Sequence, residues 1–141
     1  MKIDPLDTLF SEYIRRRAIS LTGGCERCLA QKVDTVKDNG ETFPAWKYLD
    51  CAHYHPRNKL SVRWDPDNTC GLCSGCHRYI DNDADAKVDF FLGKLGQDKK
   101  DMLAGRMRQT HPKPDKAAIT LYLKEEIKLL EQGSELSSLQ R

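Results

Sequence analysis

The sequence predicts an α+β protein in which two short strands and a helix surround metal sites, with one helix before them and several after. Three observations predict this class. The six cysteines include two Cys-x-x-Cys pairs, and three of the four histidines lie within residues 50–77. Apolar residues recur at helical spacing on both sides of that segment. We therefore expect the fold to be organised around residues 50–77.

Length and charge limit the possible functions. The chain has 141 residues, the size of one domain, and its 31% charged and 39% hydrophobic residues predict a modest core, which a metal often supplements. The net charge of +2 gives no general attraction for DNA, so binding would depend on clusters such as residues 15–17. No signal peptide or membrane-spanning apolar run is visible. We expect a cytoplasmic protein with reduced thiols, in which paired cysteines bind metal.

The first predicted element is a helix that begins at Asp4-Pro5 and ends near Gly23-Gly24. An aspartate cap followed by proline at the first helical position is typical of a helix start, and glycine of its end. Apolar residues from Leu6 to Ile14 recur at helical spacing. The arginines at 15–17 are either a solvated face or phosphate contacts.

The central segment predicts turns and strands. Residues 38–40 (Asp-Asn-Gly) favour a turn or hairpin tip. The aromatic-rich residues 45–49 predict a short strand, and residues 60–64 predict the returning strand. Residues 65–68 form a turn sequence, and the second cysteine pair is expected to open a short helix that carries His77. Two strands, a turn and a helix thus make a ββα unit.

Beyond Ile80 the pattern predicts helices. One ends at Gly96, the next is capped by Asp98, and the last is capped by Asp115 after a break at residues 111–114. The last helix carries two apolar sets, and the pattern does not decide whether they pack on the core or form a homodimer surface. The predicted segments are an N-terminal helix, a metal-binding core, a helical extension and a flexible tail, at 1–24, 25–82, 83–132 and 133–141.

The two cysteine pairs predict one structural zinc site. Cys25, Cys28, Cys73 and Cys76 supply the four thiolates of a closed tetrahedral site, and a saturated ion has no open position for catalysis. A redox motif is the alternative, but no α/β pattern surrounds the first pair. The two other cysteines, Cys51 and Cys70, are expected to be buried and free. Cys70 could, however, compete with Cys73 for the zinc ion.

Three parts of the chain resemble the HNH endonuclease motif with its zinc knuckle: residues 50–53 (Asp-Cys-Ala-His), Asn68, and residues 73–77 (Cys-x-x-Cys-His). The resemblance covers about residues 25–80. The continuation to Gly96 is similar to phage recombination endonucleases of the lambda NinG (Rap) type. The resemblance implies a ββα-metal (His-Me finger) core and a metal-dependent DNA endonuclease, encoded by a phage or prophage and acting in a bacterial cell on branched or single-stranded DNA.

The resemblance also implies roles for the motif residues. His53 matches the general base, which takes a proton from the water that attacks the phosphate; a neutral imidazole suits that role. His77 matches a ligand of one catalytic divalent cation, which we expect to be Mg²⁺ or Mn²⁺. Asn68 matches the middle residue, which holds the loop and helps to orient the histidine.

The match departs from the family at Ala52, where many members have a metal-binding Asp or His. Asp50 is the preferred substitute because a carboxylate suits Mg²⁺ or Mn²⁺, with His55 and Asp81 as further candidates. Residues two apart on a strand share a face, so His53 could instead be the ligand and His55 the base.

Basic residues between the expected base and the turn could contact DNA phosphates, or they are solvated charges. They are Arg57, Lys59 and Arg63. The main functional alternative to a nuclease is a non-catalytic zinc-knuckle module that binds nucleic acid or a protein partner, which Ala52 favours. A redox or zinc-storage protein is a third class, disfavoured by the long segment between the cysteine pairs.

Overall fold

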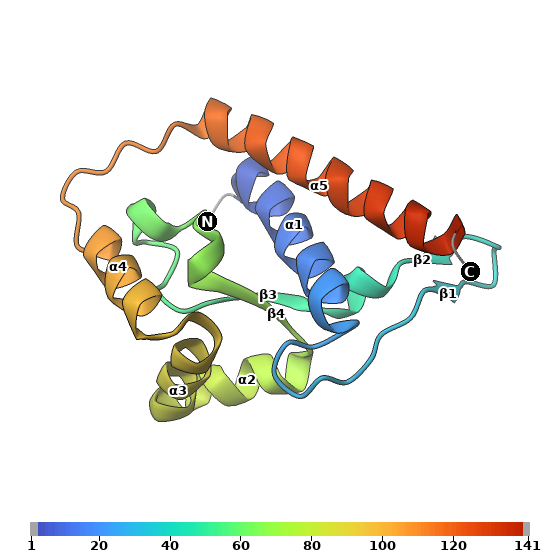
Figure 1. Cartoon of the computed structure of the whole chain (residues 1–141), viewed down its shortest axis with the longest axis horizontal. Coiled ribbons are helices and arrows are strands. Elements are labelled where there is room, and N and C mark those ends of the chain that lie inside the picture. Colours follow the sequence, from blue (N-terminus) through green and yellow to red (C-terminus); the bar gives the residue numbers. More distant parts are fainter. Residues whose placement is uncertain (1–2, 140–141) are drawn as a thin grey trace.

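We describe the fold from a computed structural model in which residues 3–139 are described, without the side chains of 134–139. The mixed α+β class is confirmed (Figure 1). The described residues form five helices, two two-stranded antiparallel sheets and three 3₁₀ turns. The helices are α1 (Pro5–Thr22), α2 (Ser74–Asn82), α3 (Ala84–Leu95), α4 (Gln97–Met107) and α5 (Lys116–Leu139). The strands are β1 (Thr35–Val36), β2 (Thr42–Phe43), β3 (Asp50–His53) and β4 (Thr69–Leu72).

Helix α1 has the predicted ends. Asp4 Oδ1 accepts a hydrogen bond from the Leu6 amide at 2.9 Å, Pro5 takes the first helical position, and Gly23 ends the helix at φ 77°. The helix packs so tightly on β4 that a Cβ built on Gly71 would lie 2.6 Å from the Ala18 Cβ. Glycine at 71 is therefore required by the close approach of α1 to the central hairpin.

The central unit has the order ββα, but the two predicted strand positions were wrong. Residues 45–48 and 60–62 are 3₁₀ turns, and the returning strand is β4, which pairs with β3 so that Asp50 lies opposite Leu72 and His53 opposite Thr69. The buried Asn68 amide donates a hydrogen bond to the Val62 carbonyl at the end of the 60–62 turn. The predicted turn at 38–40 is confirmed as the tip of the β1–β2 hairpin.

The second cysteine pair opens α2 as predicted, since Cys73 is the N-cap residue. Helix α4 begins directly after Gly96, so the expected Asp98 cap was wrong, whereas Asp115 caps α5 through the Ala118 amide at 3.0 Å. Helix α5 continues to Leu139, and residues 140 and 141 lie outside the described residues. A flexible tail over 133–141 stays a prediction.

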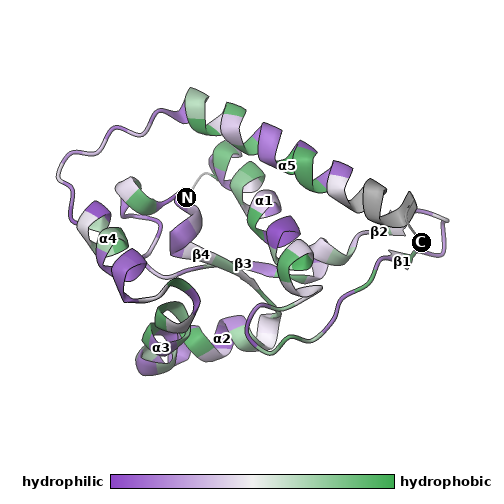
Figure 2. Cartoon of the chain, viewed as in Figure 1, coloured by the Kyte–Doolittle hydropathy of each residue, from purple (hydrophilic) through white to green (hydrophobic). Residues whose placement is uncertain are grey.

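Two apolar clusters hold these elements together. One lies between β3, β4, α2 and α3 and includes Ala52, Leu72, Ile80 and Phe91, all fully buried. The other joins α1 to α5 and includes Phe10 and Ile14 of α1 with Leu123 and Ile127 of α5. Figure 2 shows hydrophobic and hydrophilic residues mixed along each helix. Over the described part of the chain, no helix combines the length and the apolar character needed to cross a membrane.

Candidate metal centre and catalytic cleft

The four cysteines of the two Cys-x-x-Cys pairs form a cluster that could hold a metal ion. The sulfurs of Cys25, Cys28, Cys73 and Cys76 all lie within 4.8 Å of one another. Four sulfurs at about 2.3 Å from a tetrahedral zinc would be about 3.8 Å apart. The distance from Cys28 Sγ to Cys73 Sγ is 3.8 Å. The cluster therefore has the donor set and the dimensions of a structural zinc site.

Local backbone structure brings the two pairs together. The first pair lies on a tight turn after α1, in which the Leu29 amide donates to the Cys25 carbonyl at 3.0 Å. The second pair is fixed by the start of α2, where the Cys76 amide approaches Cys73 Sγ at 3.5 Å. The Arg27 guanidinium lies 3.5 Å from Cys76 Sγ, where its charge offsets that of the thiolates.

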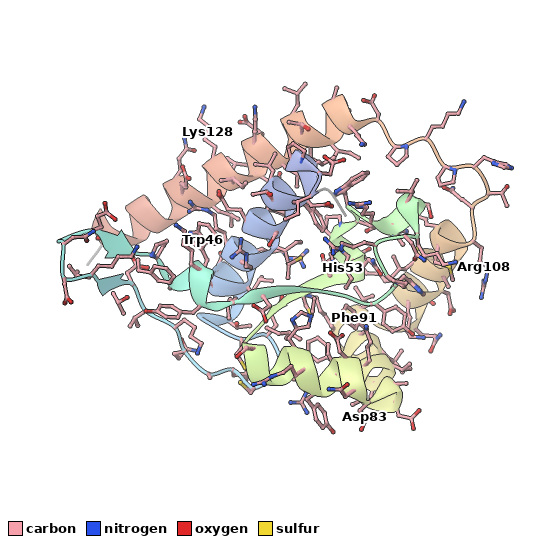
Figure 3. The ribbon with its side chains drawn as sticks, turned by 180° about the vertical axis from the view of Figure 1, so that it is seen from behind. Trp46, His53, Asp83, Phe91, Arg108 and Lys128 are labelled. Carbon is pink, nitrogen blue, oxygen red and sulfur yellow. The ribbon has the colours of Figure 1, made fainter. Side chains whose placement is uncertain are left out.

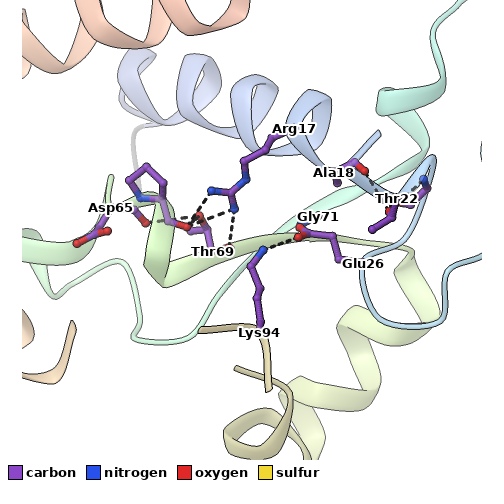
Figure 4. A network of polar contacts seen from close by, with 10 residues as sticks. Arg17, Ala18, Thr22, Glu26, Asp65, Thr69, Gly71 and Lys94 are labelled. Atoms are coloured by element: carbon purple, nitrogen blue, oxygen red, sulfur yellow. Dashed lines mark hydrogen bonds and ion pairs between the residues drawn. The ribbon is translucent and has the colours of Figure 1, made fainter. Parts of the chain in front are cut away.

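A polar network joins the first cysteine turn to β4 (Figure 4). The Glu26 carboxylate accepts a hydrogen bond from the Gly71 amide at 2.5 Å and forms an ion pair with Lys94 of α3. Beside it, the Arg17 guanidinium donates to the carbonyls of Pro66 and Thr69. Arg17 thus secures the end of the 54–68 loop instead of facing solvent.

The remaining two cysteines lie outside the cluster and are free. Burial raises the pKa of Cys51 to about 12 and raises that of the fully buried Cys70 as well. Both thiols therefore stay protonated at neutral pH, and neither is placed to replace Cys73 in the cluster.

A cleft of about 750 Å³ opens between α1, β3 and α2. Successive residues of β3 face opposite sides of the sheet. Cys51 packs against the apolar cluster that joins α1 to α5, and Ala52 belongs to the cluster between β3, β4, α2 and α3. Asp50, Cys51 and His53 are the residues of β3 that line the cleft. The lining residues that can take part in chemistry are Asp7, Ser11, Arg15, Asp50, Cys51, His53, Arg57, His77, Asp81 and Lys87.

His53 lies at the end of β3, near the centre of the molecule (Figure 3). Its Nε2 is 3.1 Å from the Arg63 carbonyl, and its ring packs against Phe10 at 6.2 Å between centroids. Burial lowers the pKa of His53 below its ordinary value of 6.5. The imidazole is therefore neutral at pH 7, and the bond to the carbonyl favours a proton on Nε2, which leaves Nδ1 free to accept one.

His77 lies between two carboxylates in the same cleft. Its Nδ1 is 3.0 Å from Asp50 Oδ2, and its Nε2 is 3.2 Å from Asp81 Oδ2. Asp81 follows His77 by one turn of α2, while Asp50 comes from β3. In the described residues, only the four cysteines form a group of three or more His, Cys, Asp or Glu side chains with all ligand atoms within 4.8 Å.

Asn68 has no exposed surface and does not line the cleft. Its Oδ1 accepts from the His55 amide at 2.8 Å, and its Nδ2 donates to the carbonyls of His55 and Val62 at 3.0 and 3.1 Å. The side chain thus joins the first and last parts of the 54–68 loop, between β3 and β4.

Three predicted site residues lie elsewhere. β3 ends at His53, so the same-face argument for His55 does not hold, and His55 does not line the cleft. Lys59 lines a separate hollow. The Arg63 guanidinium is held by Asp7, with Nε at 2.9 Å from Oδ1, and Asp7 Oδ1 also accepts from Trp64 Nε1 at 2.9 Å. Arg63 therefore anchors the loop to α1, and its guanidinium is not free for phosphate.

The cleft also contains Arg15, one of the arginines considered above as phosphate contacts, and three residues that the sequence patterns did not mark: Asp7, Ser11 and Lys87. Asp7, Ser11 and Arg15 come from α1, and Lys87 comes from α3, where it is paired with Asp81 at 3.4 Å. The first three recur at intervals of four, so they share one helix face. That spacing is a signal in the sequence, but nothing in it shows that this polar face borders the cleft.

Comparison with known proteins found no matching family model, no matching curated protein and no matching solved structure.

Proposed function

We propose that this protein is a metal-dependent DNA endonuclease of the HNH type, with a ββα-metal core braced by a structural zinc. The observation that carries the proposal is the shared cleft: His53 from β3 and His77 from α2 line it together with Asp50. One residue of this set is a half-buried neutral base, and the others offer nitrogen and oxygen as ligand atoms. Such a pairing suits hydrolysis of a phosphodiester.

His53 is the proposed general base. Its neutral ring takes a proton from a water molecule that attacks the phosphorus, while the Arg63 carbonyl holds the ring in one orientation. Arg15 and Arg57 lie in the same cleft, where their charges attract and orient the phosphate. Asn68 keeps the loop behind His53 in one conformation through its three hydrogen bonds.

Asp50, His77 and Asp81 are the residues that would hold the divalent cation. Their oxygen and imidazole donors suit Mg²⁺ or Mn²⁺. When bound, the cation supplies charge that stabilises the transition state and the leaving oxygen. The two carboxylates face different nitrogens of the His77 ring, Asp50 at Nδ1 and Asp81 at Nε2, so the side chains would have to turn for one cation to bind all three.

The cysteine cluster supports the site indirectly. Cys76 precedes His77, so the cluster that fixes the start of α2 also fixes the position of His77 relative to β3. A structural zinc therefore contributes to activity through geometry, and it takes no part in the chemistry.

A plasmid-nicking assay tests the proposal. The purified protein, His53→Ala and His55→Ala are each incubated with supercoiled plasmid and with branched oligonucleotides, with added Mg²⁺, with Mn²⁺, or with no added cation. Omitting the cation is preferable to a chelator, which would also remove zinc. We expect cation-dependent nicking that His53→Ala loses and His55→Ala keeps. Undiminished cleavage by His53→Ala would refute the assignment of the base, and loss in His55→Ala alone would transfer the role to His55.

A non-catalytic zinc-knuckle module is the second candidate. The observation in its favour is Ala52, which is fully buried in the core and supplies no ligand where many HNH proteins have one. DNA binding without cleavage under any cation would support this function instead.

A further inference from the structure

A second hollow lies beside the cleft, on the far side of the 56–59 loop. Pro56 and Arg57 line the cleft, whereas the next two residues, Asn58 and Lys59, line the second hollow. Four consecutive residues therefore separate the two spaces. A chain that leaves the cleft over this loop would enter the second hollow directly.

The second hollow has the chemistry of an anion site. Its volume is about 440 Å³, and it lies between the loop and the end of α4. It contains two cationic side chains, Lys59 and Arg108, and no carboxylate, together with amide and hydroxyl groups. Its lining is completed by Asn58, Leu60, Ser61, Met107, Gln109, Thr110 and Pro112.

The cations of this surface are free of ion pairs with the described side chains, unlike their neighbours. Lys87 is paired with Asp81, and Arg106 with Asp65. Lys59 and Arg108 are exposed and form no such pair with the described residues. The α4 C-terminus carries only about half a negative charge, which these two full positive charges outweigh.

Positive charges near this hollow also act on the neighbouring His55. The pKa of His55 is lowered, first by burial and then by the positive charges of Lys100, Lys87, Lys59 and Arg108. Cations from the loop, α3, α4 and the residue after α4 thus all act on His55. Lys100 also lies over the Tyr54 ring, 5.5 Å from its centroid.

We propose that this surface, centred on Lys59 and Arg108, binds the phosphodiester backbone of DNA that flanks the strand held in the cleft. The occupant is a polyanion because the hollow offers cations and neutral hydrogen-bonding groups without a carboxylate. Its position one loop away from the cleft makes it a continuation of the same path. This inference extends the proposed function, but its test measures binding without cleavage.

The test is fluorescence anisotropy of labelled duplex and single-stranded oligonucleotides, without added divalent cation, over a range of salt concentrations. Lys59→Ala/Arg108→Ala should weaken binding by about tenfold at 0.1 M salt and reduce the duplex salt slope by about 1.8, since each phosphate contact contributes about 0.9. The matched control, Lys124→Ala/Lys128→Ala, removes the same charge from the exposed side of α5 (Lys128 in Figure 3) and should leave the slope unchanged.

The single variant Arg108→Lys keeps the positive charge at this position. It should therefore bind duplex DNA with the same salt slope as the unmodified protein. Thermal melts show whether each variant is folded. A double alanine variant that binds as tightly as the control, or a control that weakens equally, would overturn the inference. Failure of the nuclease proposal is a separate result, seen as intact plasmid while this binding difference persists.

Discussion

Asn68→Ala tests whether one buried amide holds the 54–68 loop. The side chain makes three hydrogen bonds, one from the His55 amide and two to the carbonyls of His55 and Val62, at 2.8 to 3.1 Å. It has no exposed surface. Alanine removes all three bonds and leaves the backbone groups without these partners.

The expected cost follows from these contacts. Each lost hydrogen bond is worth about 1 kcal/mol, and a backbone group left unpaired in the interior costs about 1–3 kcal/mol. Because the loop can relax and admit water, we take the lower end and expect a loss of roughly 3–5 kcal/mol. That is a large part of the roughly 5–15 kcal/mol by which domains are stable.

Urea denaturation followed by circular dichroism measures the effect. Asn68→Ala should shift the midpoint to lower urea with an unchanged slope, because the surface exposed on unfolding hardly changes. The matched control is Asn82→Ala, at the exposed end of α2, which should change the free energy of unfolding by less than about 0.5 kcal/mol. A loss below about 1 kcal/mol in Asn68→Ala would refute the role assigned to the amide.

The remaining predictions concern the two metal-related sites. Elemental analysis should find about one zinc per chain, lost in Cys25→Ser but kept in Cys51→Ser, because only Cys25 belongs to the sulfur cluster; zinc retained by both variants would contradict the assignment. Because burial lowers the pKa of His53 from 6.5, kcat/KM for cleavage should be constant near neutral pH and fall only below pH 6.5. Because the pKa of His53 is lower in the folded state, this residue binds more protons in the unfolded state below pH 6.5. The free energy of unfolding should therefore also fall as the pH drops below 6.5, and it should fall less in His53→Ala. A loss of activity centred above pH 7 would contradict the neutral-base assignment.

Local signals predicted the elements that local chemistry decides. The ends of α1 follow from Asp4, Pro5 and Gly23, whose capping and turn preferences act within a few residues. The start of α2 at the second cysteine pair, the cap at Asp115 and the hairpin tip near Gly40 have the same origin.

The strands were misplaced because pairing partners, not local propensity, select them. Residues 45–49 and 60–64 have aromatic and β-branched residues that suit a strand, yet neither segment has a partner strand there. Likewise, α5 carries two apolar sets: Leu123 and Ile127 are buried against α1, whereas Leu121 and Leu129 are exposed. The sequence pattern alone could not choose between them.

The sequence by itself determined which four cysteines gather, because metal binding needs particular side chains at short spacings that leave few arrangements. It also marked His53, Asn68 and His77 as residues to examine. Only the tertiary structure decided that His53 and His77 share a cleft, that Asp7 pairs with Arg63, and that Arg108 and Lys59 line the same hollow. Those relations join residues far apart in the chain, and packing of the helices around a short hairpin sets them.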